Sequence, residues 1–311
     1  MVTSAAVKNL ARECGFELCG IAPAGPAADF ARYQAWVARG RAGEMRYLTD
    51  RRAEMRRDPR SLLASAKSVI CVGKLYNSGE PYCDPPVSRY AWGREDYHDV
   101  LRRGLEALAS RLSAIKPCEW KICVDTAPLL ERTYARLAGL GWIGKNTCLI
   151  HEPLGSWFFL GELLTSLELE PDAPPPDRCG ACTRCIDACP TQAIVPEGDG
   201  WTLDSRRCIS YLTIELRGPM PEELTAGVGS RVFGCDVCQE VCPWNARAPV
   251  TAEPGFARRP MPPLAEMARM SEDQFREFAR GTPLARPKYA GFLRNIRAAL
   301  RNESGGGDPV G

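Results

Sequence analysis

The sequence of 311 residues lacks three features, and each absence narrows the class of protein. No apolar run reaches the roughly 18 residues of a membrane-spanning helix, so we expect no membrane association. The N-terminus, MVTSAAVKNLARECGF, lacks the long apolar core of a secretory signal peptide, which favours a reducing, cytoplasmic compartment. The net charge is only +2, so any polyanionic partner must be met by a local basic patch.

Two nucleotide-binding motifs are also absent. No GxGxxG turn follows the first predicted strand, and the sequence contains no GxxxxGK[ST] loop. The nearest glycine-rich segment is LAGLGWIGKN at 137–146, whose glycines allow the backbone to approach something bulky. The same glycines are typical of a plain helix C-cap and turn, so both interpretations stay open.

Cysteine, in contrast, is abundant, and eight of the 15 cysteines fall in two short arrays. The first, CGACTRCIDACP at 179–190, has the C-x2-C-x2-C-x3-C-P spacing of bacterial ferredoxins. The second is CDVCQEVCP at 235–243, with one cysteine upstream. Because the last cysteine of each run in two-cluster ferredoxins ligates the other cluster, we predict two 4Fe-4S clusters. The predicted ligands are Cys179, Cys182, Cys185 and Cys242 for one cluster, and Cys189, Cys208, Cys235 and Cys238 for the other.

Zinc and disulfides are the alternatives for these cysteines. Thiolates in C-x-x-C pairs would also satisfy zinc, but two runs that end in Cys-Pro favour cubane clusters. Disulfides are disfavoured because the expected compartment is reducing. The other cysteines show no ligand spacing, and most are predicted to be ordinary buried thiols: Cys14, Cys19, Cys71, Cys83, Cys118, Cys123 and Cys148.

Apolar periodicity predicts an α/β fold, more closely an α+β sandwich, for the N-terminal part of the chain. Apolar residues at helical spacing alternate with short apolar runs of strand character. Helices are predicted near 7–14, 30–37, 97–112 and 128–138, and strands at 18–22, 67–73, 120–125, 147–150 and 157–164. The segment SRRCISYLTIELRG, between the two cysteine arrays, is also predicted to be helical.

The proline-rich segment PDAPPPD at 171–177 predicts a domain boundary. We expect an α/β domain at 1–170, a ferredoxin-like domain with two clusters at 171–250, a helical C-terminal segment at 251–303 and a disordered tail at 304–311. About 170 residues precede the clusters, which is more than an electron carrier requires. The α/β domain should therefore hold an electron acceptor.

Five further segments carry a resemblance that runs over nearly the whole chain. They are SRYAWGREDYHDVLR at 88–102, VDTAPLLERTYARLAGLGWIGKNTCLI at 124–150, GSWFFLGELLTSLELEPD at 155–172, RRCISYLTIELRGPMPEEL at 206–224 and FGCDVCQEVCPWN at 233–245. With the first cysteine array, they resemble the epoxyqueuosine reductases. The resemblance implies cobalamin bound in the α/β domain, two 4Fe-4S clusters beside it, and a tRNA anticodon arm carrying epoxyqueuosine as substrate. It also implies an oxidoreductase that performs the last step of queuosine biosynthesis, reducing the epoxide at the wobble position to an alkene.

The resemblance implies a proton donor as well. Asp125, at the end of the predicted strand WKICVD, matches the family's proposed catalytic acid. A carboxyl donates a proton near neutrality only if burial raises its pKa, which a corrin ring overhead would favour. The alternative is that Asp125 caps the helix predicted to begin near residue 128.

Other predicted contacts with cobalamin are less specific. We expect them at Asp125, Lys145, Asn146, Thr147, His151 and Ser210, and a plain turn, surface or core role remains open for all but the first. The family is thought to bind cobalamin without a histidine on cobalt. His98 is therefore expected to be a structural partner on a partly buried helix face.

Binding of tRNA depends on where the cations lie. Phosphates set affinity through lysine and arginine, while a splayed wobble base is read in a pocket. Residues 39–60 hold eight arginines against four acids, and residues 280–301 hold six basic residues and no acid, although either can be a solvated helix face. We expect tRNA contacts from Arg206, Arg207, Arg217, Arg286, Lys288 and Arg294. Many relatives carry a further C-terminal domain of helical repeats, and this sequence stops near residue 311 without it, which leaves the extent of the tRNA contact open.

Removing an epoxide oxygen as water takes two electrons and two protons, so an external low-potential electron donor is also expected. Separately, the chain is expected to be a monomer. Two other classes remain. One is another corrinoid and iron-sulfur reductase, such as a reductive dehalogenase acting on a small molecule, and the other is a non-catalytic electron carrier. Respiratory dehalogenases usually begin with a twin-arginine signal, but the first Arg-Arg pair here is at 51–52.

Overall fold

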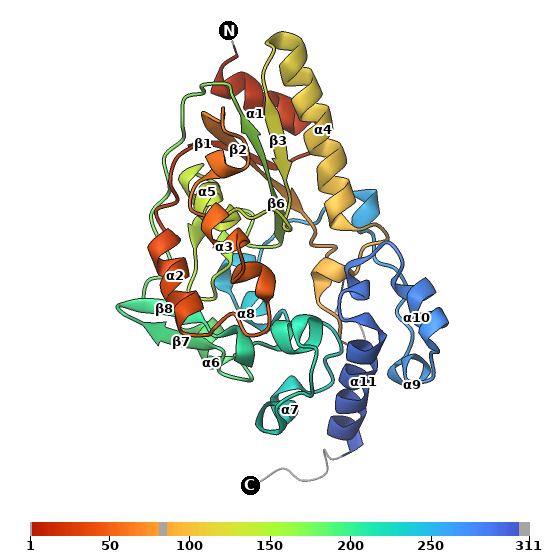
Figure 1. The fold of residues 1–311 in the computed structure, drawn as a ribbon. Coiled ribbons are helices and arrows are strands. Elements are labelled where there is room, and N and C mark those ends of the chain that lie inside the picture. The colour runs from red at the N-terminus through yellow and green to blue at the C-terminus, as the bar shows by residue number, and fades with distance from the viewer. Residues whose placement is uncertain (1, 81–85, 305–311) are drawn as a thin grey trace.

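The computed structural model describes residues 2–80 and 86–304 (Figure 1). At its centre is a four-stranded sheet in the order β1-β2-β6-β3, with every neighbouring pair antiparallel. The strands are β1 (Leu18–Pro23), β2 (Ser68–Leu75), β6 (Phe158–Thr165) and β3 (Trp120–Cys123). The mixed α/β fold is confirmed, and the antiparallel pairing makes it an α+β sandwich.

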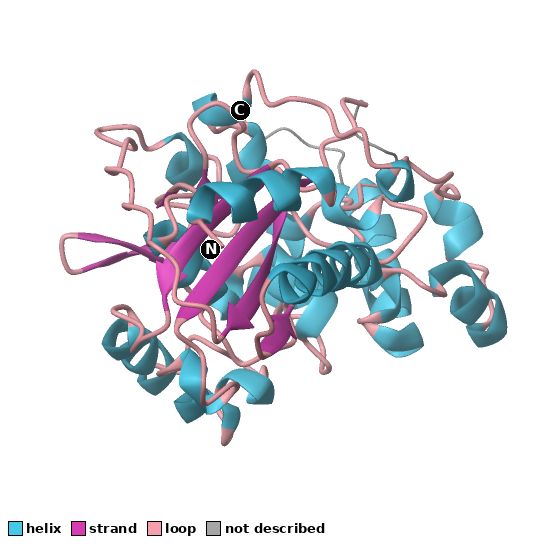
Figure 2. Ribbon diagram, turned by 90° about the horizontal axis from the view of Figure 1, so that it is seen from above, coloured by secondary structure: helices cyan, strands magenta, loops and turns pink. Residues whose placement is uncertain are grey.

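Both faces of this sheet are covered, as the view from above shows (Figure 2). The helices that surround it are α1 (Ser4–Glu13), α2 (Phe30–Ala38), α3 (Arg52–Met55), α4 (Tyr97–Ile115) and α5 (Glu131–Leu137). On β2, Ile70 and Val72 pack in the core shared with α1 and α4, whereas Val69 and Cys71 pack in the core shared with α5. Side chains of a strand alternate between faces, so a strand buried on both sides reads as one continuous apolar run.

The connection after α5 is short and turns sharply. A small hairpin, β4 (Trp142–Ile143) and β5 (Leu149–Ile150), follows and leads back into β6. At Gly141, φ is 158°, and an added Cβ would lie 2.2 Å from the carbonyl oxygen of Ile150. The glycine-rich segment therefore serves a close approach of two backbones, which is the turn interpretation left open above.

The cysteine arrays lie on short elements below the sheet. These are α6 (Arg184–Asp187), β7 (Ile194–Glu197), β8 (Gly200–Leu203), α7 (Glu222–Val228) and α8 (Val237–Glu240). The helical segment predicted between the arrays is present as short turns of other helix types: residues 205–207 form a 3-10 turn and Tyr211–Glu215 a π-helical turn. Side chains from the C-terminal helix explain the difference, since Asn295 donates to the carbonyl of Thr213 and Arg294 to that of Leu212.

The C-terminal segment forms a helical layer of its own. It contains α9 (Leu264–Met267), α10 (Glu272–Ala279) and α11 (Lys288–Ser304), whose apolar faces share a core with residues near Trp92. Ser271 and Gln274 form a capping box that begins α10. Helix α11 continues to Ser304, and the rest of the predicted disordered tail lies outside the described residues. Within the described part of the chain, no helix is long and apolar enough to cross a membrane.

Outside the two arrays, the prediction of buried thiols holds for two cysteines. Cys71 and Cys123 are buried, Cys83 lies outside the described residues, and the partly buried ones are Cys14, Cys19, Cys118 and Cys148.

Candidate active site and cysteine clusters

Asp125 stands in the turn that follows β3, where its φ is 48°. Its side chain is 59% exposed, and its backbone amide donates a hydrogen bond of 2.6 Å to Oε1 of Glu131. Helix α5 begins only at Glu131, and Leu130 occupies its N-cap position. The alternative in which Asp125 caps this helix is therefore wrong. The first residue of the helix instead fixes the backbone of Asp125.

A histidine lies opposite the Asp125 carboxyl. His98 belongs to the first turn of α4, where Asp96 is the N-cap residue and lies 2.7 Å from His98 Nδ1. The other ring nitrogen, Nε2, is 3.4 Å from Oδ2 of Asp125. Burial lowers the pKa of His98, but hydrogen bonds and charges of Asp125 and Asp96 outweigh it and raise that pKa to about 9. The ring is thus a cation at neutral pH.

Sequence reasoning treated His98 as a structural partner and missed this pairing. The signal was present in the segment EDYHDV, where an acidic N-cap residue precedes the histidine by two positions. An Asp-x-His pair at a helix start directs both side chains to the same end of the helix. Nothing in the sequence indicated that Asp125 would meet that end, because the contact spans 27 residues.

A cavity of about 800 Å³ opens beside Asp125. Val124 and Thr126, the two neighbours of Asp125, line it, and its volume falls within the roughly 300–1,000 Å³ of ligand pockets. Its other lining residues combine apolar groups with four cations: Met55, Leu62, Ile122, Cys123, Ala127, Pro128, Arg51, Arg52, Arg102 and Lys121. Such walls suit a large ligand with an apolar ring face and with amide or phosphate groups at its edge, which are the features of cobalamin.

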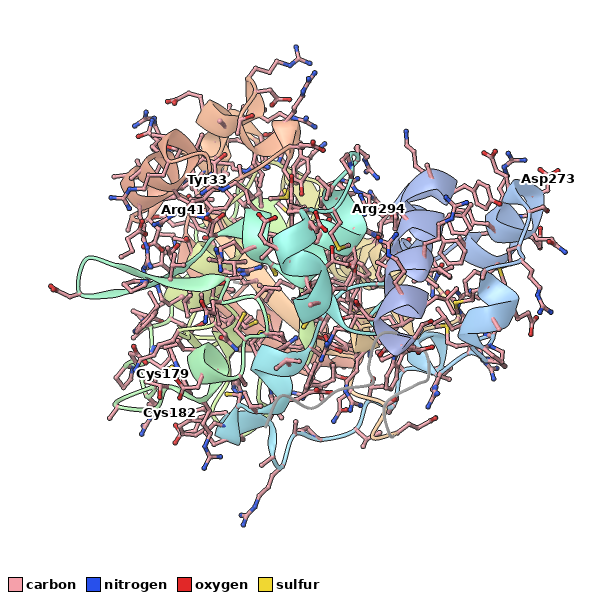
Figure 3. The ribbon with its side chains drawn as sticks, turned by 90° about the horizontal axis from the view of Figure 1, so that it is seen from below. Tyr33, Arg41, Cys179, Cys182, Asp273 and Arg294 are labelled. Carbon is pink, nitrogen blue, oxygen red and sulfur yellow. The ribbon has the colours of Figure 1, made fainter. Side chains whose placement is uncertain are left out.

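The structure brings the first predicted ligand set together. Cys179, Cys182, Cys185 and Cys242 line a second cavity of about 330 Å³, and Figure 3 shows the first two side by side. Burial raises the pKa of Cys185 to about 11, and the thiolates of Cys179, Cys242 and Cys182 add to this rise. One cysteine of the second array therefore joins three of the first, and four converging thiolates are the ligand set of a 4Fe-4S cluster.

The second predicted set is also assembled from both arrays. Burial raises the pKa of Cys208, and the nearby thiolate of Cys189 contributes. Burial likewise raises the pKa of Cys235 to about 12, with a contribution from Cys208. The pKa of Cys238 is raised by its hydrogen bond with Cys148 and by burial, with further contributions from Cys208 and Cys235. Each of these thiols lies near others of the same set, so this donor set also fits a cluster.

Three of the other predicted cofactor contacts hold the cysteine loops. The ammonium of Lys145 donates to the carbonyls of Gly180 and Cys182, at 2.7 Å and 3.0 Å. Asn146 donates to the carbonyl of Cys238 at 3.1 Å, and Ser210 donates to the Cys208 thiolate. None of the three lines the 800 Å³ cavity. Their contact with cobalamin stays a prediction.

Thr147 and His151 lie around the small hairpin. Thr147 has a φ of 65°, and its carbonyl accepts a hydrogen bond of 2.8 Å from Arg132. Burial lowers the pKa of His151, and its Nδ1 has no hydrogen-bond partner among the described residues. A neutral imidazole with a free buried nitrogen is suited to a ligand that the protein alone does not supply.

Half of the predicted tRNA contacts cluster between the π-helical turn and α11. Arg217 donates to the carbonyl of Arg286 at 2.9 Å, and Arg294, labelled in Figure 3, donates to the carbonyls of Leu216 and Gly218 at 2.8 Å. Burial lowers the pKa of Arg286, but Glu215 and the charge of Asp125 raise it. Arg286 is the member of this cluster that interacts with the charge of Asp125.

The remaining predicted tRNA contacts lie apart from that cluster. Arg206 pairs with Asp204 at 2.7 Å, and Arg207 donates to the carbonyl of Thr191 at 3.0 Å. Lys288 is exposed at the start of α11.

Comparison with known proteins gives two family models that match the chain. A 4Fe-4S double cluster binding domain matches residues 178–245, and a model described as epoxyqueuosine reductase QueG, DUF1730, matches residues 56–126. An epoxyqueuosine reductase of Xanthomonas campestris is 42% identical over 98% of this chain and 88% of the relative. One of Escherichia coli is 40% identical over 95% of this chain and 80% of the relative.

Solved structures agree with these relatives. An epoxyqueuosine reductase crystallised with an epoxyqueuosine-modified tRNA-Tyr stem loop matches with a TM-score of 0.87 and 31% identity, over 96% of this chain and 80% of that one. A Bacillus subtilis epoxyqueuosine reductase, whose catalytic aspartate loop is swung out of the active site, matches with a TM-score of 0.85 and 30% identity, over 96% and 81% of the two chains.

The family models, the relatives and the fold all point to the same chemistry. The cofactors are cobalamin and two 4Fe-4S clusters, and the enzyme is an oxidoreductase. That the cavity beside Asp125 and the two cysteine sets hold these groups stays a prediction. With about 40% identity to curated relatives over almost its full length, this chain belongs to the epoxyqueuosine reductase family.

Proposed function

We propose that this chain reduces epoxyqueuosine to queuosine at the wobble position of tRNA, with Asp125 as the proton donor. The observation that carries the proposal is that Asp125 stands between two residues that line the 800 Å³ cavity, Val124 and Thr126, with its carboxyl facing His98. The reaction removes the epoxide oxygen as water and consumes two electrons and two protons. Bound in the chain, the corrinoid and the clusters supply the two electrons.

The protons come from the chain. The Asp125 carboxyl would pass a proton to the epoxide oxygen. His98 lies 3.4 Å from Asp125 and, held at its other nitrogen by Asp96, can return a proton to it. The three residues form one proton path.

The two cysteine sets hold the clusters. Cys179, Cys182, Cys185 and Cys242 would ligate one, and Cys189, Cys208, Cys235 and Cys238 the other. The apolar groups of the 800 Å³ cavity would face the corrin, and its cations the polar edge of the cofactor or the substrate. Lys145, Asn146 and Ser210 would act from the cluster side, by fixing the loops that carry the thiolates.

The basic side chains would bind the tRNA substrate. Arg217, Arg286 and Arg294 would contact phosphates of the anticodon arm, because Arg217 interacts with both of the others and Arg286 interacts with the charge of Asp125. Arg206, Arg207 and Lys288 would extend this contact. An external low-potential protein would supply electrons to a monomeric enzyme in the cytoplasm, where its tRNA substrate occurs.

Mass spectrometry of nucleosides tests the proposal. Epoxyqueuosine-containing tRNA is incubated with the reduced, cobalamin-loaded protein, and the wild type should remove the mass of one oxygen from the modified nucleoside. Asp125→Ala and the isosteric Asp125→Asn should lower the single-turnover rate by roughly 10²–10⁴-fold. Iron content and the corrinoid absorbance of each variant serve as controls and should match the wild type. Turnover that survives in both variants would remove Asp125 as the acid, and a loaded wild type without turnover would contradict the function.

A further inference from the structure

A second carboxyl pair lies behind the Asp125 turn. Glu162, on the central strand β6, is completely buried and stands in register with Cys71 on β2 and Cys123 on β3. Neither of its oxygens has a hydrogen-bond donor among the described residues. An ionised carboxylate in that position would be costly, so Glu162 must carry a proton.

The group that meets Glu162 is another carboxyl. Glu131, the first residue of α5, interacts with it: burial together with the Glu131 charge raises the pKa of Glu162 far above its usual range, and burial together with the Asp125 charge raises the pKa of Glu131 to about 7. Two carboxyls in contact share one proton, because both cannot be ionised side by side. The proton on Glu162 therefore lies between them, and Glu131 keeps an oxygen free to accept a further hydrogen bond.

That free oxygen meets the backbone of Asp125. The amide of Asp125 donates to Glu131 Oε1 at 2.6 Å. The Asp125 backbone adopts a φ of 48°, a left-handed conformation that aspartate tolerates but does not prefer. A hydrogen bond to a carboxylate is among the stronger ones, so it can hold a residue in a sparsely populated conformation. The held conformation is the one in which Oδ2 faces His98.

We propose that Glu131 is a positioning residue, which is held by the protonated carboxyl of Glu162 and fixes the backbone of Asp125 so that its side chain faces His98. Glu131 does not touch the substrate in this scheme, and Glu162 acts only through Glu131. The inference rests on the proposed role of Asp125 as proton donor. Its structural part, the hold on the Asp125 amide, is independent of that role.

Matched substitutions separate the positioning of Asp125 by Glu131 from a general contribution of Glu131 to the stability of the fold. Glu131→Ala removes the acceptor, whereas Glu131→Gln keeps a carbonyl oxygen for the Asp125 amide and gains an amide that can face Glu162. Glu162→Gln keeps a donor toward Glu131. Glu106→Ala, at an exposed position of α4, is the control for handling and loading.

Hydrogen exchange of the Asp125 amide, resolved by fragmentation in the mass spectrometer, gives a readout that does not need activity. Glu131→Ala should speed this exchange roughly tenfold or more, because the amide loses a charge-assisted hydrogen bond. Glu131→Gln and Glu162→Gln should stay within about threefold of the wild type.

Single-turnover rates of the loaded proteins complete the test. Glu131→Ala should lower the rate by roughly hundredfold, since a misplaced catalytic group costs about that much, with unchanged iron and corrinoid content. Both glutamine variants should keep a rate within about threefold. Wild-type exchange and rate in Glu131→Ala would overturn the proposal, as would glutamine variants that fall as far as the alanine variant. If the loaded wild type does not act on epoxyqueuosine, the proposed function fails, and the exchange data still decide whether Glu131 holds the Asp125 amide.

Discussion

At the scale of single residues, the Asp125 turn is held from two sides. Glu131 accepts the backbone amide of Asp125, and His98 faces its carboxyl with Asp96 behind the ring. The His98 ring lies between the carboxyls of Asp125 and Asp96, so a proton is held close to the cavity. Chemistry at this turn should therefore depend on the charge of His98.

The first prediction concerns pH. The folded-state pKa of His98 is raised from 6.5 to about 9, so its ion pairs stabilise the fold fully below pH about 6.5 and lose this effect as pH rises through about 9. His98→Gln should melt below the wild type at pH 6, and the difference should vanish near pH 10. Melting curves of both proteins across this range check it. A difference that grows with pH would contradict the assignment.

The second prediction concerns proton return. Because Asp96 holds the ring through Nδ1, Asp96→Asn should lower the pKa of His98 and shift the alkaline limit of turnover to lower pH. The maximal single-turnover rate should change less than in Asp125→Asn, which removes the donor itself. A pH–rate profile for the three proteins measures both effects. An unchanged alkaline limit in Asp96→Asn would show that His98 takes no part.

At the scale of elements, the C-terminal helix α11 shapes the segment that carries Cys208. Asn295 is completely buried and donates to the carbonyls of Thr213 and Val232 at 2.7 Å and 2.9 Å. These bonds satisfy carbonyls that an α-helix would have paired within itself, so Tyr211–Glu215 settles into a π-helical turn. The helical layer therefore supports the segment that carries Cys208.

The third prediction follows from this support. Asn295→Ala leaves two buried carbonyls without donors and should destabilise the loaded protein by about 2–4 kcal/mol. The melting temperature and the iron retained after brief heating are the measurements. Asn302→Ala, which loses bonds from a partly buried amide near the end of α11, is the matched control and should cost less. Equal melting temperatures for Asn295→Ala and the wild type would contradict the supporting role.

The sequence predicted helices and strands correctly where the apolar residues followed a single clear spacing. The 97–112 helix and the strand around Val69 to Val72 have a clear apolar pattern, and both are present in the structure. The helix predicted near 128 begins at Glu131, because the Asp125 turn occupies the preceding residues. The kind of helix in the 205–218 segment could not be predicted from the sequence, because the side chains that bind its backbone, Arg294 and Asn295, lie far along the chain.

At the scale of the whole molecule, the sequence predicted the cofactors more clearly than it predicted how the residues around Asp125 are arranged. The two-cluster ferredoxin spacing predicted the crossed cysteine sets, and thiols of each set lie near one another in the structure, while their assignment as cluster ligands stays a prediction. The Asp125, His98 and Glu131 arrangement was not predictable in this way. It depends on β3, α4 and α5 meeting at one point, which no local pattern specifies.

The fourth prediction tests the crossing. Cys242→Ser should disturb the cluster of the first array, although Cys242 belongs to the second, and Cys189→Ser should disturb the other cluster. Each variant should lose up to about half of its iron, with changes in different electron paramagnetic resonance signals after reduction. Cys118→Ser, outside both sets, should keep all of it. If Cys242→Ser and Cys235→Ser altered the same signal, the crossed assignment would be wrong.

The central claim is that Asp125 protonates the epoxide oxygen at the cavity beside β3. A structure of this chain with cobalamin and an epoxyqueuosine-bearing stem loop tests it most directly. We expect an Asp125 carboxyl oxygen at about 2.6–3.2 Å from the epoxide oxygen, with Val124 and Thr126 against the bound groups. An Asp125 side chain turned away, with another acid or a water at that oxygen, would contradict it.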